Sequence, residues 1–332
     1  MMSMAALSRR RAIQVTAALA GVGLLPAASR AALKPLVWRG TALGATSSLT
    51  LYHPDEEEAR RLLESVLVEI DRLERVFSLY RADSAVSRLN RDGRLEAPPL
   101  ELVELLGQAR SVSELTDGAF DVTVQPLWRL YADHFARPDT DPNGPGQADL
   151  ARALSLVDYR AVQVSGGALA FERPGMAVTL NGIAQGYITD RVATLLRRAG
   201  FDRVLIDLGE IRALGRHPDG RPWTAGIAHP EDRHRLLHEL ALEDRALATS
   251  AATGLRFEPS GRHHHLFDPR SGYSVRRYDS VSVLAPSAAL ADGLSTGFSG
   301  MEAQAVERVC NALPDVTAIV LAGDGQLHSL GA

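Results

Sequence analysis

The 332-residue sequence has a single cysteine, Cys310. One thiol excludes an intramolecular disulfide, even in an oxidising compartment, and it excludes zinc sites built on a pair of cysteines. The sequence also lacks a His-Glu-x-x-His motif, which is the signature of many zinc metalloproteases. The standard metalloprotease signature is therefore absent.

An excess of charge of either sign is missing as well. The formal net charge is −4, and charged residues make up 23% of the chain with both signs mixed along it. Such a balance offers no basic surface for nucleic acid or for an anionic membrane. Hydrophobic residues at 45% and a length of 332 residues describe a globular protein with a sizeable core.

The sequence has no apolar run long enough to span a bilayer comfortably, which takes about 20 residues. Its most apolar N-terminal stretch, residues 12–25, follows Arg9, Arg10 and Arg11 and precedes a small-residue segment ending at Ala31. A basic start, a short apolar run and a Ser-x-Ala cleavage site predict an export signal of the twin-arginine type, residues 1–31. A short membrane anchor is the alternative. No cysteine lies near the cleavage site, so we expect a soluble periplasmic protein that is not a lipoprotein.

Hydrophobic periodicity and turn residues predict an irregular alternation of helices and strands. A strand with a glycine-marked bend is expected at 39–53, and a helix at 55–77 with Asp55 as its N-cap. Further helices are expected at 99–115, 186–199, 288–299 and 302–313, and strands at 203–209, 223–228, 246–250, 280–285 and 317–322. Residues 137–147 form a loop, which we interpret as a surface excursion rather than a linker. The pattern favours an α+β fold.

Two clusters carry candidate chemistry. Asp292 and Thr296 are four residues apart, so on a helix both oxygens would lie on one face and could suit a hard cation such as Mg²⁺. The alternative is a helix-terminal aspartate with an exposed threonine. In the run 263–265, three adjacent histidines cannot all bind one metal, but one beside a turn is a candidate acid or base. A solvated polar loop is the alternative there.

Two glycine-containing stretches indicate a functional site less specifically. Residues 179–187 read TLNGIAQGY, and a loop-to-helix junction of this kind can present backbone N–H groups to a phosphate. They match neither the P-loop nor the dinucleotide-binding fingerprint. Residues 116–128, TDGAFDVTVQPLW, are compatible with a turn followed by a strand.

The order of the motifs is more specific than any one of them. Over residues 39–300 the chain resembles the ApbE family, the FAD:protein FMN transferases. The motifs that carry the resemblance are GTALGA (40–45), Ser78, Tyr80, Ser84 and Asn90, DGAFDVTVQPL (117–127), GIAQGYITD (182–190), DLGE (207–210), Thr249-Ser250, HHLFDPRSG (264–272) and ADGLST (291–296).

The resemblance implies an ApbE-like single domain at 32–332, with mixed or antiparallel sheets flanked by helices. It implies cleavage of FAD at its pyrophosphate and transfer of FMN to a threonine hydroxyl of another protein, with release of AMP. Asp292, Thr296 and the carbonyl of Gly182 would hold Mg²⁺, His265 would assist deprotonation of the acceptor, and Asn90 would position groups. The residues expected to contact the flavin and adenine are Leu43, Tyr80, Ala119, Phe120, Asp121, Thr179, Gln185, Phe267 and Ser295.

The sequence departs from the family motifs at Leu43, Ala45, Thr179, Gln185 and Glu210, and the last of these replaces a glycine. The motif set with a twin-arginine signal looks like the NosX branch, which serves maturation of nitrous oxide reductase in denitrifying bacteria. The expected acceptor is then a NosR-type membrane protein with a periplasmic FMN domain. A non-catalytic flavin carrier and an FAD pyrophosphatase remain alternatives.

Overall fold

The computed structural model describes residues 33–42 and 44–331, so the predicted signal at 1–31 and Leu43 lie outside the described residues. The strands are β1 Pro35–Ala42, β2 Ala45–Tyr52, β3 Arg94–Glu96, β4 Val162–Ser165, β5 Ala168–Phe171, β6 Val204–Asp207, β7 Ile211–Leu214, β8 Trp223–His229, β9 Asp232–Leu242, β10 Ala246–Ala251, β11 Tyr278–Ala285, β12 Thr317–Ala322 and β13 Leu327–Leu330. The α-helices are α1 Glu56–Phe77, α2 Ala85–Asp92, α3 Leu100–Leu115, α4 Gln125–Phe135, α5 Gln147–Leu154, α6 Ala184–Arg198, α7 Ala288–Phe298 and α8 Ala303–Ala312. Short 3₁₀ turns lie at Val122–Val124, Tyr159–Ala161 and Ala252–Gly254.

An eight-stranded sheet organises the molecule, in the order β1-β2-β6-β7-β10-β11-β12-β13. Each neighbouring pair of strands in this sheet is antiparallel. The strands β3, β5 and β4 form a small separate sheet, and β8 pairs with β9. Antiparallel sheets flanked by helices confirm the predicted α+β class.

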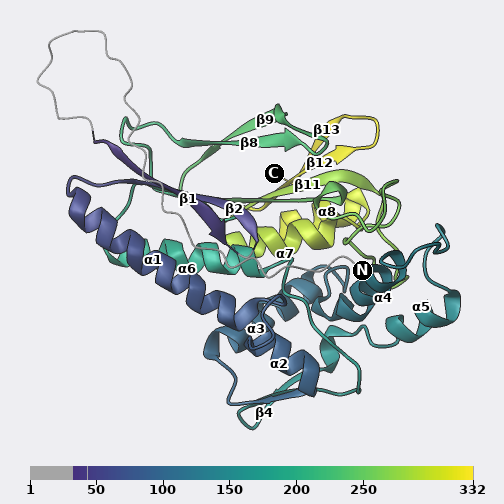
Figure 1. Cartoon of the computed structure of the whole chain (residues 1–332). Helices are drawn as coiled ribbons and strands as arrows, with labels where there is room; N and C mark the ends of the chain where they lie inside the picture. The colour runs from purple at the N-terminus through teal and green to yellow at the C-terminus, as the bar shows by residue number, and fades with distance from the viewer. Residues whose placement is uncertain (1–32, 43, 332) are drawn as a thin grey trace, which may run out of the picture.

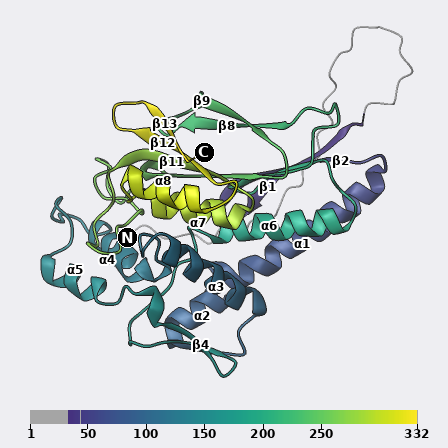
Figure 2. The ribbon, with the colours of Figure 1, turned by 180° about the vertical axis from the view of Figure 1, so that it is seen from behind.

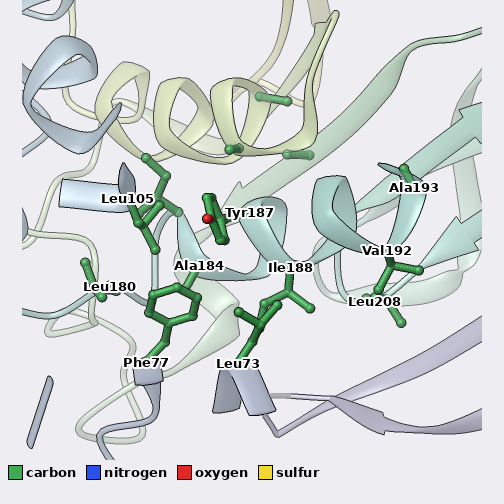
Figure 3. Close-up of a cluster of buried hydrophobic side chains, with 14 of the residues drawn as sticks. Leu73, Phe77, Leu105, Leu180, Ala184, Tyr187, Ile188, Val192, Ala193 and Leu208 are labelled. Atoms are coloured by element: carbon green, nitrogen blue, oxygen red, sulfur yellow. The ribbon is translucent and has the colours of Figure 1, made fainter. Parts of the chain in front are cut away.

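Helices α6 and α7 run along one face of the large sheet, with α1 and α3 beyond them (Figures 1 and 2). The apolar positions at three- and four-residue spacing in α1 explain this arrangement, because they place Leu63, Val66, Ile70 and Leu73 on its buried face. Figure 3 shows Leu73 and Phe77 of α1 beside residues of α6 in the main core. The hairpin β8–β9 covers the opposite face of the sheet, over a second core that includes Trp223 and Ile227.

The amphipathic elements expected from the sequence are confirmed within two residues at most ends. Asp55 caps α1 by accepting a hydrogen bond from the Glu58 N–H at 3.0 Å. The glycine-marked bend at 39–53 is the turn of the hairpin β1–β2, where Gly44 has φ +87°. Residues 136–146 lie between α4 and α5, as expected for a loop.

One expectation is wrong. After the turn at 116–120 the chain forms no strand, because a 3₁₀ turn at Val122–Val124 leads directly into α4. The Asp121 carboxylate caps that turn by accepting from the Thr123 N–H at 2.7 Å. Pro126 in the first turn of α4 favours a helix start, because its missing N–H has no helical partner there. Capping and proline position thus outweigh the strand preference of the valines.

Helices α6 and α7 approach so closely at Gly186 that a Cβ there would lie 2.3 Å from the backbone oxygen of Ala288. We expect Gly186→Ala to lower the free energy of unfolding by about 2 kcal/mol or more, since forced overpacking against backbone costs on that order. Gly107→Ala is the matched control, because a Cβ at this exposed position in α3 would meet nothing within 4 Å.

Denaturant unfolding measures both variants. The control should be about 0.5–1 kcal/mol more stable than the wild type, because alanine favours the helix over glycine. If Gly186→Ala were stabilised by as much as Gly107→Ala, the close approach of α6 and α7 would be contradicted.

Candidate active site

The contact between α6 and α7 places Asp292 at the centre of the candidate site. Its carboxylate lies in the middle of α7 and is 4% exposed. The Gly186 N–H at the start of α6 donates to Oδ2 at 3.1 Å. The alternative of a helix-terminal aspartate is therefore wrong.

Thr296 lies one helical turn after Asp292, beside the loop that precedes α6. A Cβ at Gly182 would lie 2.8 Å from Thr296 Oγ1, so only glycine lets this loop come so close. The residues predicted to hold a cation, Gly182, Asp292 and Thr296, are thus assembled from two segments that are far apart in the sequence.

A chain of hydroxyl groups orients the Thr296 side chain. Ser295 Oγ donates to the carbonyl oxygen of Asp292 at 3.0 Å, and Ser250 Oγ lies 2.8 Å from Ser295 Oγ and 3.2 Å from Thr296 Oγ1. The Ser295 hydroxyl proton is already donated to Asp292, so the Ser250 hydroxyl must be the donor in its hydrogen bond with Ser295. With its own proton used in this way, Ser250 can only be the acceptor in its hydrogen bond with Thr296. The lone pairs of Thr296 are then available to another ligand.

Burial controls the electrostatics of the site. It raises the pKa of Asp292 to about 7, and the nearby Asp190 adds to the rise while the Gly186 N–H opposes it. Asp190 itself is held by Arg212 at 2.9 Å and by the N–H groups of Ala288 and Ala289. Asp190 therefore anchors the start of α7, and Asp292 has no basic partner recorded among the described residues.

The donor set suits a hard cation rather than zinc. No group of three or more histidine, cysteine or acidic side chains suited to a metal occurs in the described part of the chain. A cation here would have to be held by a carboxylate, a hydroxyl and backbone oxygen together. Mg²⁺ prefers oxygen ligands of this kind and keeps positions for water and phosphate.

The histidine run is not a solvated loop. His263 and His264 are 4% and 2% exposed. His263 packs against Tyr131 and Phe135, with ring centroids 5.5 and 5.1 Å apart. His264 Nε2 lies 2.7 Å from the carbonyl oxygen of Val275, and burial lowers the pKa of this imidazole to about 4. Both side chains are parts of the packed structure.

His265 has the hydrogen-bonding pattern of a base. Its Nδ1 lies 3.0 Å from the carbonyl oxygen of Leu255, which can only accept, so Nδ1 carries the proton and Nε2 keeps its lone pair. Burial lowers the pKa of this imidazole, which keeps it neutral near pH 7. Gly254 leaves room for the ring, because a Cβ there would lie 3.1 Å from Cε1 and 3.5 Å from Nε2.

The turn that packs against His265 follows β10, the strand that carries Ser250. Ser250 is at the end of β10, and the 3₁₀ turn Ala252–Gly254 follows it directly. Gly254, the last residue of this turn, packs against the His265 ring. His265 is thus placed beside the turn that follows the strand carrying Ser250.

Asn90 supports the site indirectly. Its Nδ2 donates to the carbonyl oxygen of Val178 at 2.8 Å, and its Oδ1 accepts from the Val178 N–H at 2.7 Å. Both ends of the amide are used, so the structure assigns Asn90 to positioning the 178–182 loop. The prediction that Asn90 positions groups in the site is compatible with these contacts and stays a prediction.

A cavity of about 560 Å³ extends from Tyr80, which is 75% exposed, to Asn90 and Asn181. Asn181 directly precedes Gly182, so this cavity reaches the loop beside Thr296. Its size falls within the range of small-molecule sites, about 300–1,000 Å³. A second cavity, of about 590 Å³, is bordered by Ala119 and Phe267.

Of the other residues predicted to contact the flavin or adenine, some lie at the contact between α6 and α7 and some in the segments beside it. Gln185 and Ser295 lie at the centre, and Gln185 covers the 207–210 turn, where a Cβ at Gly209 would be 2.6 Å from its Nε2. Thr179 joins the loop to the 3₁₀ turn by donating from its N–H to the carbonyl oxygen of Val122 at 2.7 Å.

Phe120 and Asp121 serve the fold. Phe120 is 3% exposed and packs against α7 at Gly297. Asp121 accepts from the Thr123 N–H and hydroxyl and from the Tyr159 N–H. Their side chains already have partners within the protein, so the structure does not bring them to an open surface of the site. The prediction that Leu43 contacts the flavin falls outside the described residues.

Comparison with known proteins decides the family. The sequence profile described as the ApbE family matches residues 43–320. The FAD:protein FMN transferase of Vibrio cholerae is 34% identical over 291 residues, which are 85% of this chain and 83% of that protein. That of Salmonella typhimurium is 28% identical over 312 residues, or 90% and 88% of the two chains. The chain belongs to the ApbE family.

Solved structures agree with this assignment. The flavin transferase ApbE from Vibrio cholerae superimposes with a TM-score of 0.75 at 27% identity, over 90% of this chain and 96% of that one. The ApbE protein from Thermotoga maritima gives a TM-score of 0.78 at 25% identity, over 89% and 96%. The predicted ApbE-like fold is confirmed, and so is the enzyme class, since the relatives are named transferases.

Sequence reasoning missed part of this ApbE-family site. Trp128 and Arg129 of α4 line the first cavity, but that segment was compatible with a strand. Residues 293–297 read Gly-Leu-Ser-Thr-Gly, the spacing of a hydrolase nucleophile elbow. They lie inside α7 with Ser295 only 1% exposed, so they form no strand–turn–helix elbow. The small residues instead allow α7 to pack closely at Gly293 and Gly297.

Proposed function

We propose that this protein is an FAD:protein FMN transferase, which joins the FMN half of FAD to a threonine hydroxyl of another protein and releases AMP. The observation that carries the proposal is the assembly of Gly182, Asp292 and Thr296 in a chain that belongs to the ApbE family. The ApbE-family relatives named as FAD:protein FMN transferases span most of this chain.

The reaction exchanges a phosphoanhydride bond of FAD for a phosphoester bond to threonine. The acceptor threonine oxygen bonds to the phosphorus of the FMN half, the bond from that phosphorus to the bridging pyrophosphate oxygen breaks, and AMP leaves with the bridging oxygen. His265 Nε2 takes the proton of the threonine hydroxyl, since Nδ1 is held as a donor to Leu255. Asp292, Thr296 and the Gly182 carbonyl would hold Mg²⁺, which when bound neutralises charge on the pyrophosphate.

The chain's own groups position the substrate. The hydroxyl chain through Ser250 and Ser295 holds Thr296 with its lone pairs directed away from Ser250. The cavity between Tyr80 and Asn181 is large enough for a ring system of FAD and leads to the Gly182 loop. Asn90 keeps that loop in place through Val178.

The acceptor is expected outside the cytoplasm. The arginines at 9–11 and the apolar run at 12–25 support export by the twin-arginine route to the periplasm. In the described part of the chain, no helix combines the length and the apolar character needed to cross a membrane. A covalent phosphoester would prevent loss of a cofactor from an exported protein.

The NosX-like motif set and signal support a role in nitrous oxide respiration, with a NosR-type membrane protein as acceptor. Its threonine should lie in a short loop rich in glycine, serine and alanine, so that the hydroxyl can approach the pyrophosphate. Deleting the gene and analysing the acceptor's periplasmic flavin domain by mass spectrometry tests this role. Full FMN occupancy in the deletion strain, with no second transferase present, would contradict it.

A direct assay tests the activity itself. The mature protein is incubated with FAD, Mg²⁺ and a periplasmic flavin domain, and the products are separated by mass. We expect FMN on the acceptor threonine and equimolar AMP. Free FMN with AMP and an unmodified acceptor would identify an FAD pyrophosphatase, and unchanged FAD bound to the protein would identify a flavin carrier.

A further inference from the structure

Glu210 is a buried carboxylate that the proposed reaction has not used. It ends the turn between β6 and β7 and is 7% exposed. The Thr249 N–H donates to the Glu210 carboxylate. The Oε2 atom of Glu210 is nevertheless buried and has no hydrogen-bond partner among the described residues. A buried carboxylate oxygen without a partner is costly, and in a native protein it points to an unseen ligand or to a shared proton.

The position of Glu210 joins it to the candidate cation site from the sheet side. The negative charges of Asp292, on α7, and of Asp207 act on the Glu210 carboxylate, and that of Asp292 acts more strongly. Its hydrogen-bond donor Thr249 directly precedes Ser250, whose hydroxyl lies 3.2 Å from Thr296 Oγ1. Glu210 and Asp292 therefore approach the same space from the turn before β7 and from α7.

No basic side chain is recorded with either carboxylate in the described structure. The nearest candidate along the chain, Arg212, is already paired with Asp190 at 2.9 Å and with the carbonyl oxygen of Pro286 at 2.7 Å. Two buried ionised carboxylates repel each other, and a positive charge placed between them removes that repulsion while both stay ionised. Oxygen donors around such a charge match a divalent cation of the Mg²⁺ type.

We propose that Glu210 contributes its unpaired Oε2 to the divalent-cation site, so that this chain holds the cation with two carboxylates, Asp292 and Glu210. The inference rests on the proposed function, which uses the same cation. It assigns a role to a residue that stands where the resembling family motif has glycine. It also explains why a carboxylate is kept in the core of the fold without an ion pair.

Binding of Mn²⁺ tests the assignment. The mature protein with saturating FAD is titrated with Mn²⁺, and free Mn²⁺ is measured by electron paramagnetic resonance. We expect Glu210→Gln to weaken Mn²⁺ binding about 10- to 100-fold, the usual loss when a supporting group of a metal site is removed. Glu210→Asp keeps the charge on a shorter side chain and should lie between Glu210→Gln and the wild type.

Glu239→Gln is the matched control, because it removes the same charge from an exposed position on β9. Its Mn²⁺ affinity should equal that of the wild type. Far-UV circular dichroism and a thermal melt in chelator establish that each variant is folded. A folded Glu210→Gln with wild-type Mn²⁺ affinity would overturn the inference and leave the proposed transferase intact.

Failure of the proposed function gives a different result. If the wild type with FAD binds no Mn²⁺ and transfers FMN in excess chelator, the cation site itself is wrong and the role of Glu210 falls with it. If the wild type binds Mn²⁺ but transfers no FMN to any acceptor, the cation site survives and the transfer reaction is wrong. The two proposals are thus separated by one titration and one transfer assay.

Discussion

Replacing Asp292 with asparagine is expected to lower the rate of FMN transfer by about 10³-fold or more. A bound cation contributes several kcal/mol to the stabilisation of charge in the transition state, and each 1.36 kcal/mol or so is a factor of ten in rate. Asparagine keeps an oxygen that can accept from the Gly186 N–H but loses the charge that holds the cation. Initial rates of FMN transfer measure the effect.

The same variant should fold at least as well as the wild type. Asp292 is 4% exposed and burial raises its pKa, so the ionised carboxylate is a cost to the fold when no cation is bound. We therefore expect an unchanged or higher melting temperature in chelator. Wild-type transfer by Asp292→Asn, or wild-type transfer without divalent cation, would contradict the assignment of Asp292 as a ligand.

Replacing His265 with alanine is expected to slow transfer by about 10² to 10⁴-fold, the usual contribution of a general base, while FAD binding is retained. The reason is the hydrogen bond from Nδ1 to the Leu255 carbonyl oxygen, which leaves Nε2 as the only ring nitrogen that can accept a proton. FAD binding by fluorescence and single-turnover transfer separate the two effects. Loss of both together would show a structural role.

The acid limb of the pH profile provides an independent check. Burial lowers the pKa of His265 below its ordinary value of 6.5, so the neutral base persists to a pH below 6.5. With saturating Mg²⁺, which keeps Asp292 ionised, the rate of transfer should be constant around pH 7 and fall only as the pH drops through the lowered pKa of His265. A fall already complete at pH 6.5 would contradict a buried neutral base.

The choice of control depends on the structure. In a solvated polar loop, the alternative that the sequence left open, His263→Ala would be nearly silent. The structure corrects this, because His263 is 4% exposed and packs against Tyr131 and Phe135. Its removal should destabilise the fold. His238, exposed on β9, is the suitable control.

The sequence by itself determined the local elements and the family. Periodic apolar residues in 55–77 and the capping residue Asp55 specified α1, because side chains three and four residues apart share a helix face. The ordered motifs specified the ApbE family, and the comparisons confirmed it. The four-residue spacing of Asp292 and Thr296 also placed both side chains on one face of α7.

Only the tertiary structure decided which residues meet. Gly182 reaches Thr296, and Ser250 reaches Ser295, across separations that no local pattern encodes. Burial was equally invisible in the sequence, since His263, Asp121 and Glu210 are polar residues that usually lie at the surface. Their roles depend on the groups that packing brings against them. Periodicity describes one segment at a time, whereas a site is made by the contacts between segments.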